Sequence, residues 1–472
     1  MKKTLIRALS FFLTLSLLTG LLSPLAGAIE YEGVESITVD ATAALLIDLD
    51  SDQVLYDQDA DQQRYPASIT KIMTALLTLE AVGRGELDLS TEVTVDAAAL
   101  TDITDDSSTA NLKAGEVISV KDLLYCLLVS SANEAANILA MTVCGDIPTF
   151  VDRMNQRAQE LGMTGTHFAN AHGLHDENHY TTARDLTILS CWAWKNPDFR
   201  EYATTTAHTV PATNLSDSRA LHTTNYLTSA QITAKYYYSK ASGIKTGFTT
   251  PAGGCLAATA TDGNLTYLSV VCGCETLIDS NGEDLDMRFV ETKRLMEFGF
   301  ENFDYVQVLS DTQMLGQPAV TNAKGRANVV VHANANATVL LPKSCRAEDI
   351  TMNLVYDSTQ TLDAPLEEGQ RVGTVTAMYQ GIPLASAELV TLTAVERDGG
   401  LLDLPSETPT QQETAEKESS GLMKYWYLIV PLAILFILIC ILLLVRAANI
   451  RKAKRRAERR RRREAQRRNG NV

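Results

Sequence analysis

An apolar segment that begins after Ser68 organises the first part of the chain. From Ile69 to Glu80 the apolar side chains lie on nearly every face of a helix, which is typical of a helix buried in a core. Two glycines just beyond this segment predict its end. Ahead of it, apolar runs at 43–48 and 54–56 flank a polar Asp-Ser-Asp-Gln stretch and predict a β-hairpin. The pattern therefore predicts a hairpin that leads directly to a buried helix.

The next apolar segments predict two consecutive helices with a polar break between them. Ser119 and Asp122 form a capping box before an apolar helix that continues to Val129. A Ser-Ser-Ala-Asn turn at 130–133 interrupts the apolar pattern, and a second helix is predicted from Glu134 onward. Such a turn between apolar helices is unusual because buried hydroxyls and amides need hydrogen-bond partners.

From residue 241 the pattern changes to strands. We expect one strand at 242–248, a hairpin of 253–261 and 265–273 with an Asp-Gly turn, and an amphipathic helix at 288–298 that packs back on the sheet. Between about Tyr305 and Val395 the chain contains only short strand-like runs, which predict a separate small β domain. These runs are 328–332, 337–341, 350–356, 372–378 and 384–395.

Both ends of the chain are predicted to be targeting or membrane segments. Residues 1–28 combine three basic residues, an apolar run and a final Ala-Gly-Ala, as in a secretory signal peptide; a permanent N-terminal anchor is the alternative. Trp426–Val445 is uncharged over 20 residues, long enough to span a bilayer of about 30 Å as one helix. The predicted order is a signal peptide at 1–28, a large first domain at 29–304, a β-rich domain at 305–397, a flexible linker at 398–424, a transmembrane helix at 425–446 and a basic tail at 447–472.

Charge fixes the expected topology. From Arg446 onward the chain carries 13 Lys and Arg against two Glu, and positive flanks remain in the cytoplasm. We therefore expect a single-pass cell-membrane protein in which the part of the chain before the span lies outside the cytoplasm. The tail could bind nucleic acid, but its place directly after a span favours topology and contact with anionic lipid.

The region between the two ends is strongly acidic. The whole chain has a formal charge of −16, and because the signal carries +3 and the tail +11, residues 29–445 carry −30. Such a region should not bind nucleic acid. It suits either a cationic ligand or simply a soluble acidic surface.

Ser68 and Lys71 form the first candidate for chemistry. They lie three residues apart at the start of the buried helix, on the same face, where free N–H groups and the helix dipole favour a developing negative charge. A serine hydroxyl needs a base to become a nucleophile, and a lysine among apolar side chains can be that base. The alternative is a helix cap beside a surface lysine, because Ser-x-x-Lys alone is a common spacing.

Two further short motifs follow in the chain. The first is Ser131-x-Asn133. Its two polar side chains could point into a cleft; alternatively, Ser131 simply caps the second helix. In Lys245-Thr246-Gly247, on a predicted strand, the first two residues can hold an anion while the glycine lets another backbone approach. An ordinary strand with one glycine is the alternative.

Four of the seven histidines fall within 167–185. Their spacing is not that of a zinc helix, and Gly173 interrupts any helical face, so a structured loop near the site is favoured over a metal site. Thr181 or Thr182 is expected to cap a helix that begins near Ala183.

Together and in this order, the three motifs resemble those of the low-molecular-mass penicillin-binding proteins, the serine-type D-alanyl-D-alanine carboxypeptidases. The likeness runs from about Ala43 to Glu396 and includes the connecting segments 168–174 and 176–180. It implies an α+β transpeptidase domain with an antiparallel sheet and a helical subdomain, followed by a small all-β domain. Family members often end in an amphipathic helix lying on the membrane, whereas this chain is predicted to span it.

The resemblance also implies roles for individual residues. Ser68 would be the acylated nucleophile, Lys71 its general base, and Ser131 a proton relay to the leaving amine. Asn133 would bind the substrate amide, and Lys245 and Thr246 would hold the terminal carboxylate with help from Arg288. Gly247, which lets another backbone come close, also counts among the substrate-binding residues. The N–H groups of Ser68 and Phe248 would form the oxyanion hole. Some family members have histidine where this chain has Phe248, so a side-chain role for that histidine is absent here.

The implied reaction is removal of the terminal D-alanine from peptidoglycan stem peptides without metal or cofactor, with β-lactams as covalent inhibitors. A β-lactamase or an endopeptidase acting on crosslinks is one alternative, although no Glu-x-x-x-Asn block lies between the second and third motifs. A non-catalytic wall-binding protein of the same fold is the other. The sequence leaves peptide specificity and oligomeric state open.

Overall fold

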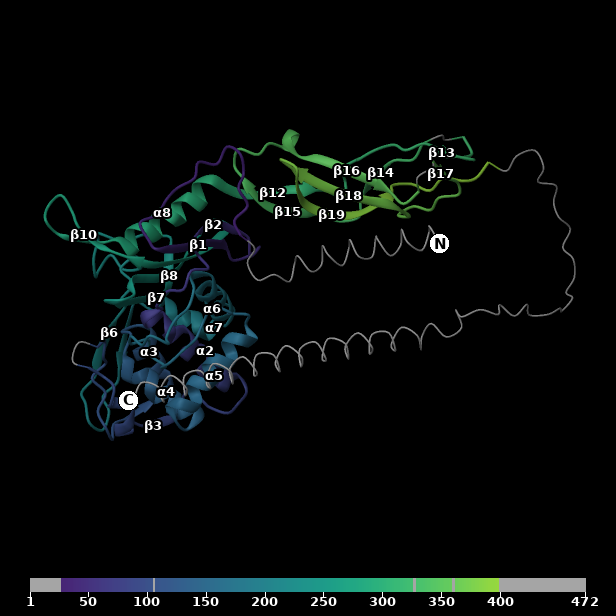
Figure 1. The fold of residues 1–472 in the computed structure, drawn as a ribbon. Coiled ribbons are helices and arrows are strands. Elements are labelled where there is room, and N and C mark those ends of the chain that lie inside the picture. The colour runs from purple at the N-terminus through teal and green to yellow at the C-terminus, as the bar shows by residue number, and fades with distance from the viewer. Residues whose placement is uncertain (1–26, 105–106, 326–327, 359–360, 399–472) are drawn as a thin grey trace, which may run out of the picture. The chain divides into compact units, whose positions relative to one another are not determined.

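The computed structural model describes residues 27–104, 107–325, 328–358 and 361–398 (Figure 1). Most of the predicted signal peptide, and the predicted linker, membrane span and basic tail from residue 399 on, lie outside these residues. Within the described ranges, no helix combines the length and apolarity needed to cross a bilayer.

The described residues form a five-stranded antiparallel sheet at the centre of the catalytic region. Its order is β2-β1-β9-β8-β7, so the predicted N-terminal hairpin pairs with the later strands through β1 and β9. The prediction of both hairpins is confirmed, although the second turns at Gly263-Asn264 and not at Asp262-Gly263. The strands are β1 Ala43–Asp48, β2 Val54–Gln58, β7 Ala241–Thr249, β8 Gly253–Asp262 and β9 Leu265–Cys274.

Both faces of this sheet are covered by helices (Figure 1). All six residues of β1 are buried, and successive side chains alternate between two cores. Leu45 belongs to the core with the helical subdomain, and Leu46 to the core with α8. The helices are α2 Lys71–Gly83, α3 Val120–Leu128, α4 Asn133–Cys144, α5 Ile147–Glu160, α6 Ala183–Lys195, α7 Pro197–Thr204 and α8 Met287–Asn302.

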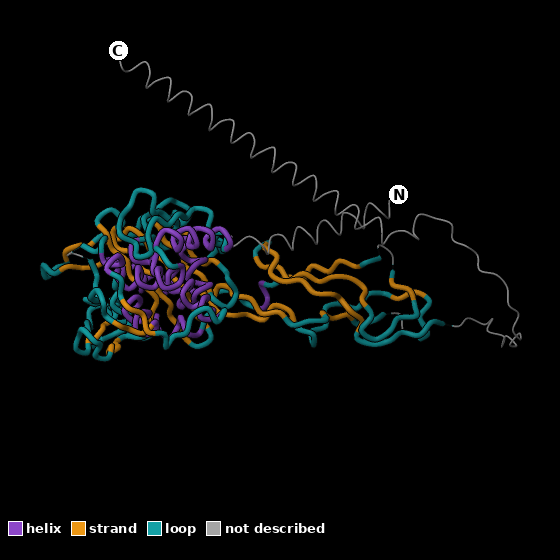
Figure 2. The backbone as a smooth tube through the Cα atoms, turned by 90° about the horizontal axis from the view of Figure 1, so that it is seen from below, coloured by secondary structure: helices purple, strands orange, loops and turns teal. Residues whose placement is uncertain are grey.

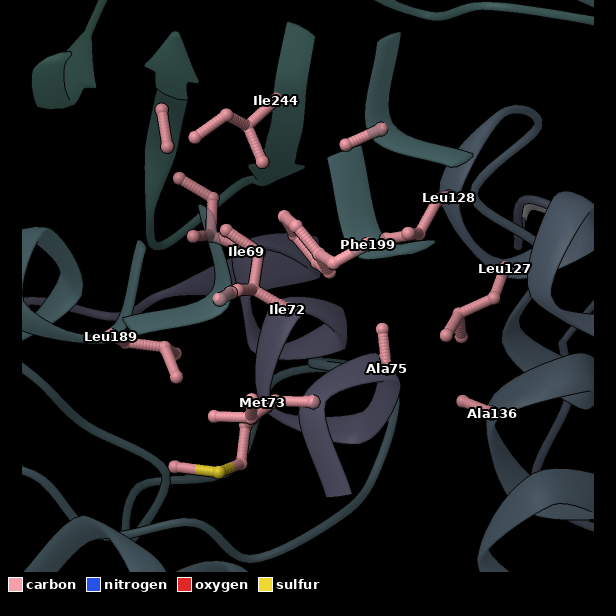
Figure 3. Close-up of a cluster of buried hydrophobic side chains, with 14 of the residues drawn as sticks. Ile69, Ile72, Met73, Ala75, Leu127, Leu128, Ala136, Leu189, Phe199 and Ile244 are labelled. Atoms are coloured by element: carbon pink, nitrogen blue, oxygen red, sulfur yellow. The ribbon is translucent and has the colours of Figure 1, made fainter. Parts of the chain in front are cut away.

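Helix α2 is the buried helix that the apolar pattern predicts. Ile72 and Met73 are fully buried among side chains from α3, α4, α6 and α7 (Figure 3). Burial of one such side chain contributes about 1.5–3 kcal/mol, so the start of α2 is held firmly in place. Two predicted caps are also confirmed: the Ser119 hydroxyl accepts from the N–H of Asp122, and Thr182 caps α6.

Short strand pairs and 3₁₀ turns complete the catalytic region. The pairs are β3 Glu92–Thr94 with β4 Val117–Ser119, β5 Ala207–Val210 with β6 Arg219–His222, and β10 Thr276–Ile278 with β11 Asp284–Asp286. The 3₁₀ turns are η1 Ala67–Thr70 and η2 Ala97–Leu100.

The part of the chain from residue 303 to 398, as far as the structure describes it, is built of strands and loops, with one short 3₁₀ turn, η3 Ala347–Asp349 (Figure 2). It contains a four-stranded sheet of order β14-β19-β18-β16 and two smaller pairs. The strands are β12 Phe303–Leu309, β13 Val320–Thr321, β14 Val331–Ala333, β15 Ala337–Pro342, β16 Thr351–Tyr356, β17 Leu362–Asp363, β18 Arg371–Tyr379 and β19 Ile382–Thr391. The all-β character predicted for this region is confirmed.

Candidate active site

Ser68 lies in a strained turn directly before α2. The sequence predicts a position at the helix N-terminus, but α2 begins only at Lys71 and Ser68 belongs to the 3₁₀ turn η1. Ala67 has φ +47°, a conformation that non-glycine residues adopt only where the surroundings enforce it. Thr70 donates its hydroxyl to the Ala67 carbonyl at 2.8 Å and contacts His179 Nε2 at 2.7 Å, which holds this turn.

The Lys71 amine lies at the centre of the site. Its side chain is completely buried, and Nζ has three oxygen neighbours. These are Ser68 Oγ at 2.8 Å, Asn133 Oδ1 at 2.6 Å and the His172 carbonyl oxygen at 2.7 Å. The first two motifs therefore meet at one nitrogen atom.

Burial changes the protonation of Lys71. Desolvation lowers the pKa of Lys71 well below its ordinary value, and the nearby charge of Lys245 lowers it further. The carboxylate of Glu134 acts in the opposite direction but is the smallest of the three influences. Burial therefore favours the neutral amine more than it would for an exposed lysine, which is the form that a general base requires.

A loop at 170–174 completes the surroundings of Lys71. Its carbonyl groups accept hydrogen bonds from α2, at 2.7 Å from Lys71 to His172 and at 2.6 Å from Thr74 to Ala171. Gly173 packs so closely on the Ser68 turn that a Cβ atom there would lie 1.9 Å from the Ala67 carbonyl oxygen. The sequence indicates only a structured loop near the site; it does not reveal these backbone contacts.

The histidines of this segment have separate partners. His172 Nε2 lies 2.8 Å from Asp102, and because its Nδ1 accepts from the N–H of Leu174, the proton resides on Nε2. His179 Nδ1 accepts from Ala169, so its Nε2–H faces Thr70. Burial lowers the pKa of His179 to about 3. These histidines position the backbone around the site.

The Ser-Ala-Asn turn faces the same amine. Ser131 does not cap α4, because the cap position is Ala132, which makes no side-chain capping bond; that alternative is wrong. Ser131 instead has φ +62° and is buried. The Ser131 hydroxyl forms no hydrogen bond with any residue that the structure describes. The residue after this turn, Glu134, accepts a hydrogen bond from the Ala110 N–H at 2.7 Å and so fixes the loop that contains Ala110.

Strand β7 forms the opposite wall. A Cβ atom on Gly247 would lie 3.0 Å from the Pro66 carbonyl oxygen and 3.1 Å from the Ser68 nitrogen, so glycine permits the close approach. The adjacent Lys245 is buried, and burial together with the charge of Arg288 lowers its pKa to about 7. The Thr246 hydroxyl faces another hydroxyl, that of Thr224, at 2.5 Å.

Arg288 lies at the start of α8 behind the end of β7. Its guanidinium donates to the Asp286 carboxylate from Nε and Nη2, and from Nη1 to the Gly247 carbonyl at 2.9 Å. It also lies over the Phe248 ring, with 6.0 Å from Cζ to the ring centroid. Arg288 thus braces the strand that passes Ser68 and adds positive charge near Lys245.

The fold and this geometry define a class of protein: enzymes that activate a serine for acyl transfer with a buried lysine. Comparison with known proteins narrows the class. Residues 30–276 match the D-alanyl-D-alanine carboxypeptidase family, and residues 303–397 match the penicillin-binding protein 5 C-terminal domain. The chain therefore belongs to the D-alanyl-D-alanine carboxypeptidase family of low-molecular-mass penicillin-binding proteins.

Individual relatives cover most of the chain. D-alanyl-D-alanine carboxypeptidase DacC of Escherichia coli is 33% identical over 384 residues, which are 80% of this chain and 90% of the relative. DacF of Bacillus subtilis is 29% identical over 363 residues, or 76% and 87%. Among solved structures, penicillin-binding protein 5 of Haemophilus influenzae matches with a TM-score of 0.58 and 28% identity, covering 77% of this chain and all of the other.

Proposed function

We infer that this protein is a serine-type D-alanyl-D-alanine carboxypeptidase that removes the terminal D-alanine from peptidoglycan stem peptides through an acyl-enzyme. The observation that carries this inference is the buried Lys71 amine held between Ser68 Oγ and two fixed carbonyl acceptors. The membership of the chain in the carboxypeptidase family agrees with it.

The three neighbours of Lys71 orient its lone pair. The amide oxygen of Asn133 and the carbonyl of His172 can only accept hydrogen bonds, whereas the hydroxyl of Ser68 can donate or accept. A neutral amine has two N–H groups and one lone pair. If it donates to the two obligate acceptors, its lone pair points at the Ser68 hydroxyl and can take the proton as the oxygen attacks. All three hydrogen bonds survive deprotonation of the amine, so desolvation decides its charge.

The remaining roles follow from where the substrate must lie. The N–H groups of Ser68 and Phe248 donate hydrogen bonds to the developing oxyanion. Loss of one such donor typically lowers the rate by about 10²–10³-fold. Ser131 returns the proton to the leaving amine. The terminal carboxylate is bound by Lys245 and Thr246, with Arg288 contributing charge from behind the strand. Asn133 contacts the substrate amide as well as Lys71, and water then hydrolyses the acyl-enzyme.

Fluorescent penicillin tests the acylation step. β-Lactams should acylate Ser68 and leave slowly, giving one labelled band for the wild type and none for Ser68→Ala with an unchanged circular dichroism spectrum. An unlabelled wild type would reject the mechanism. Release of D-alanine from a pentapeptide, compared with nitrocefin turnover and with cleavage of a crosslinked dimer, separates the carboxypeptidase from a β-lactamase or an endopeptidase.

We also propose that the enzyme acts outside the cytoplasm, anchored by a helix at 425–446 with the basic tail inside. The support is the uncharged apolar stretch, its aromatic flank and the charge asymmetry of the sequence. The β-rich region would then hold the catalytic region away from the bilayer. Extraction of cell membranes at alkaline pH should leave the full chain in the pellet and release a chain that ends before residue 425. Release of the full chain would contradict the anchor.

A further inference from the structure

Asp102 makes contacts near the site that the mechanism above does not use. It lies two residues after the end of η2, and its side chain is 48% exposed. One carboxylate oxygen lies 2.8 Å from His172 Nε2, and the other accepts from Asn137 Nδ2 at 2.7 Å. Both of these partners are buried. Asp102 therefore reaches from the surface to two buried polar side chains on different segments of the chain.

These contacts close a circuit of hydrogen bonds around the Lys71 amine. Asn133 and Asn137 lie four residues apart on α4, so they share one face of that helix. Asn133 accepts from Lys71 at 2.6 Å, while Asn137 donates to Asp102. Asp102 bonds to the imidazole of His172, and the carbonyl of that same residue accepts from Lys71 at 2.7 Å. The members of this hydrogen-bond circuit are Lys71, Asn133, Asn137, Asp102 and His172.

Within the circuit, Asp102 joins the two segments that carry the acceptors for Lys71. The amide oxygen of Asn133 belongs to α4, and the carbonyl of His172 belongs to the loop at 170–174. The relative position of these two segments decides where the lone pair of the Lys71 amine points. Because Asp102 bonds to α4 on one side and to the loop on the other, it fixes that relative position.

The His172 imidazole links Asp102 to the carbonyl of the same residue. His172 is 2% exposed, and its Nδ1 accepts from the Leu174 N–H at 3.1 Å, so both ring nitrogens are engaged. Removal of Asp102 would leave the Nε2–H buried without its acceptor, which is costly. The loop can relieve that cost by moving until the imidazole reaches water. Such a movement displaces the carbonyl that orients Lys71.

The contact works through hydrogen bonding more than through charge. Burial, Lys245 and Glu134 are the influences on the pKa of Lys71, and the carboxylate of Asp102 is not among them. An asparagine at this position could accept from His172 through its oxygen and turn its NH₂ group toward Asn137. The Oδ1 atom of Asn137 is buried and has no partner among the described residues. If that amide turns over, Oδ1 accepts the new donor, and only the bond at 3.1 Å from Asn137 to the Ala99 carbonyl is lost.

We propose that Asp102 is a positioning residue for the general base, and that it acts through Asn137 and the imidazole of His172. It holds in register the two acceptors that turn the lone pair of the lysine toward the serine hydroxyl. The assignment rests on the proposed function and adds to it a residue outside the three motifs. Since Asp102 acts on the base and not on the ligand, its removal should slow acylation without weakening the binding that precedes it.

Acylation of the full chain in detergent by fluorescent penicillin tests the assignment. Rates at increasing penicillin concentrations give a limiting rate constant and the concentration at which the rate is half-maximal. For Asp102→Ala we expect the limiting rate constant to fall about 10–100-fold, because a misplacement of 1 Å can cost that much, while the half-maximal concentration stays the same. Asp102→Asn should recover most of the lost rate, because it keeps the bonds to both partners.

Asp122→Ala is the matched control. It removes another contact between a carboxylate and a histidine, 2.9 Å from Asp122 to His208 Nε2, which lies outside the hydrogen-bond circuit. This variant should lose thermal stability without slowing acylation. A double-mutant cycle with His172→Phe tests the route, because phenylalanine removes the ring nitrogens and keeps the backbone carbonyl. In that background Asp102→Ala should slow acylation no further.

Several results would overturn the assignment while leaving the proposed function intact. They are wild-type acylation by Asp102→Ala, a raised half-maximal concentration at an unchanged limiting rate, no recovery in Asp102→Asn, equal slowing by Asp122→Ala, and an additive effect in the His172→Phe background. A wild type that penicillin does not label would instead contradict the proposed function, and the assignment of Asp102 with it.

Discussion

Replacing Gly173 by alanine should disable the serine without touching any catalytic side chain. A Cβ atom there would lie 1.9 Å from the Ala67 carbonyl oxygen and 3.0 Å from the Ser68 nitrogen, whereas real Cβ contacts are essentially never below 3.0 Å. The two backbones must therefore separate by at least about 1.1 Å. Since a misplacement of about 1 Å can cost roughly 10²-fold in rate, we expect acylation to slow by about that factor.

The same substitution also strains the backbone, and this second effect can be separated from the clash. Gly173 has φ +92°, and an alanine in this region costs roughly 1–2 kcal/mol. Gly145 has nearly the same φ, +86°, but nothing lies within 4 Å of a Cβ placed there. Gly145→Ala therefore carries the strain without the clash and is the matched control.

Fluorescent penicillin measures the effect directly, because the acylation rate reports the position of Ser68. Both variants should lose similar thermal stability from backbone strain, with an additional loss for Gly173→Ala. Only Gly173→Ala should lose acylation. Wild-type labelling by Gly173→Ala, or equal slowing in both variants, would refute the argument that close backbone packing positions the serine.

Two further predictions concern the surroundings of the lysines. Thr74→Val leaves the buried Ala171 carbonyl without its donor at 2.6 Å. It should lower the free energy of unfolding, measured by urea denaturation, by about 1–3 kcal/mol. Thr78→Val is the control: it removes a hydroxyl bonded only to a carbonyl within its own helix, so its loss of unfolding free energy should be smaller. Because the pKa of Lys245 is about 7, kcat/KM for a peptide should fall as pH rises above that value, when the ammonium loses its proton. Lys245→Arg stays charged, so a profile for that variant with an unmoved alkaline limb would contradict this assignment.

Much of the fold could be predicted because its signals are local. The Ser119 cap follows from a side chain and a backbone N–H three residues apart, and the buried helix follows from apolar residues on every face. The three motifs could likewise be recognised from residue type and spacing. What these signals do not contain is the exact start of α2, because a 3₁₀ turn and the first turn of an α-helix have nearly the same sequence requirements.

The backbone contributions to the site could not be predicted from the sequence. The carbonyl of His172 bonds to Lys71 from 101 residues away, and any residue type could supply a carbonyl there. Asp102 has no motif of its own, yet it bonds to the His172 ring across 70 residues. The segment 168–174 contributes to the family resemblance, but neither that likeness nor Gly173 indicates which backbone atoms approach the site.

The two buried lysines differ in the number of hydrogen-bond acceptors around the side-chain nitrogen, and this difference suits them to different roles. Lys71 has three oxygen neighbours in place and can satisfy all of them as a neutral amine, so it needs no ligand to be complete. Lys245 donates one hydrogen bond, to the Thr246 carbonyl at 2.9 Å, and the described residues offer its buried ammonium no other acceptor. A carboxylate at this position would satisfy its remaining N–H groups and offset the repulsion from Arg288. Under the proposed function, the arriving D-alanine terminus would therefore stabilise the charged form of Lys245 and leave Lys71 free to act as the base.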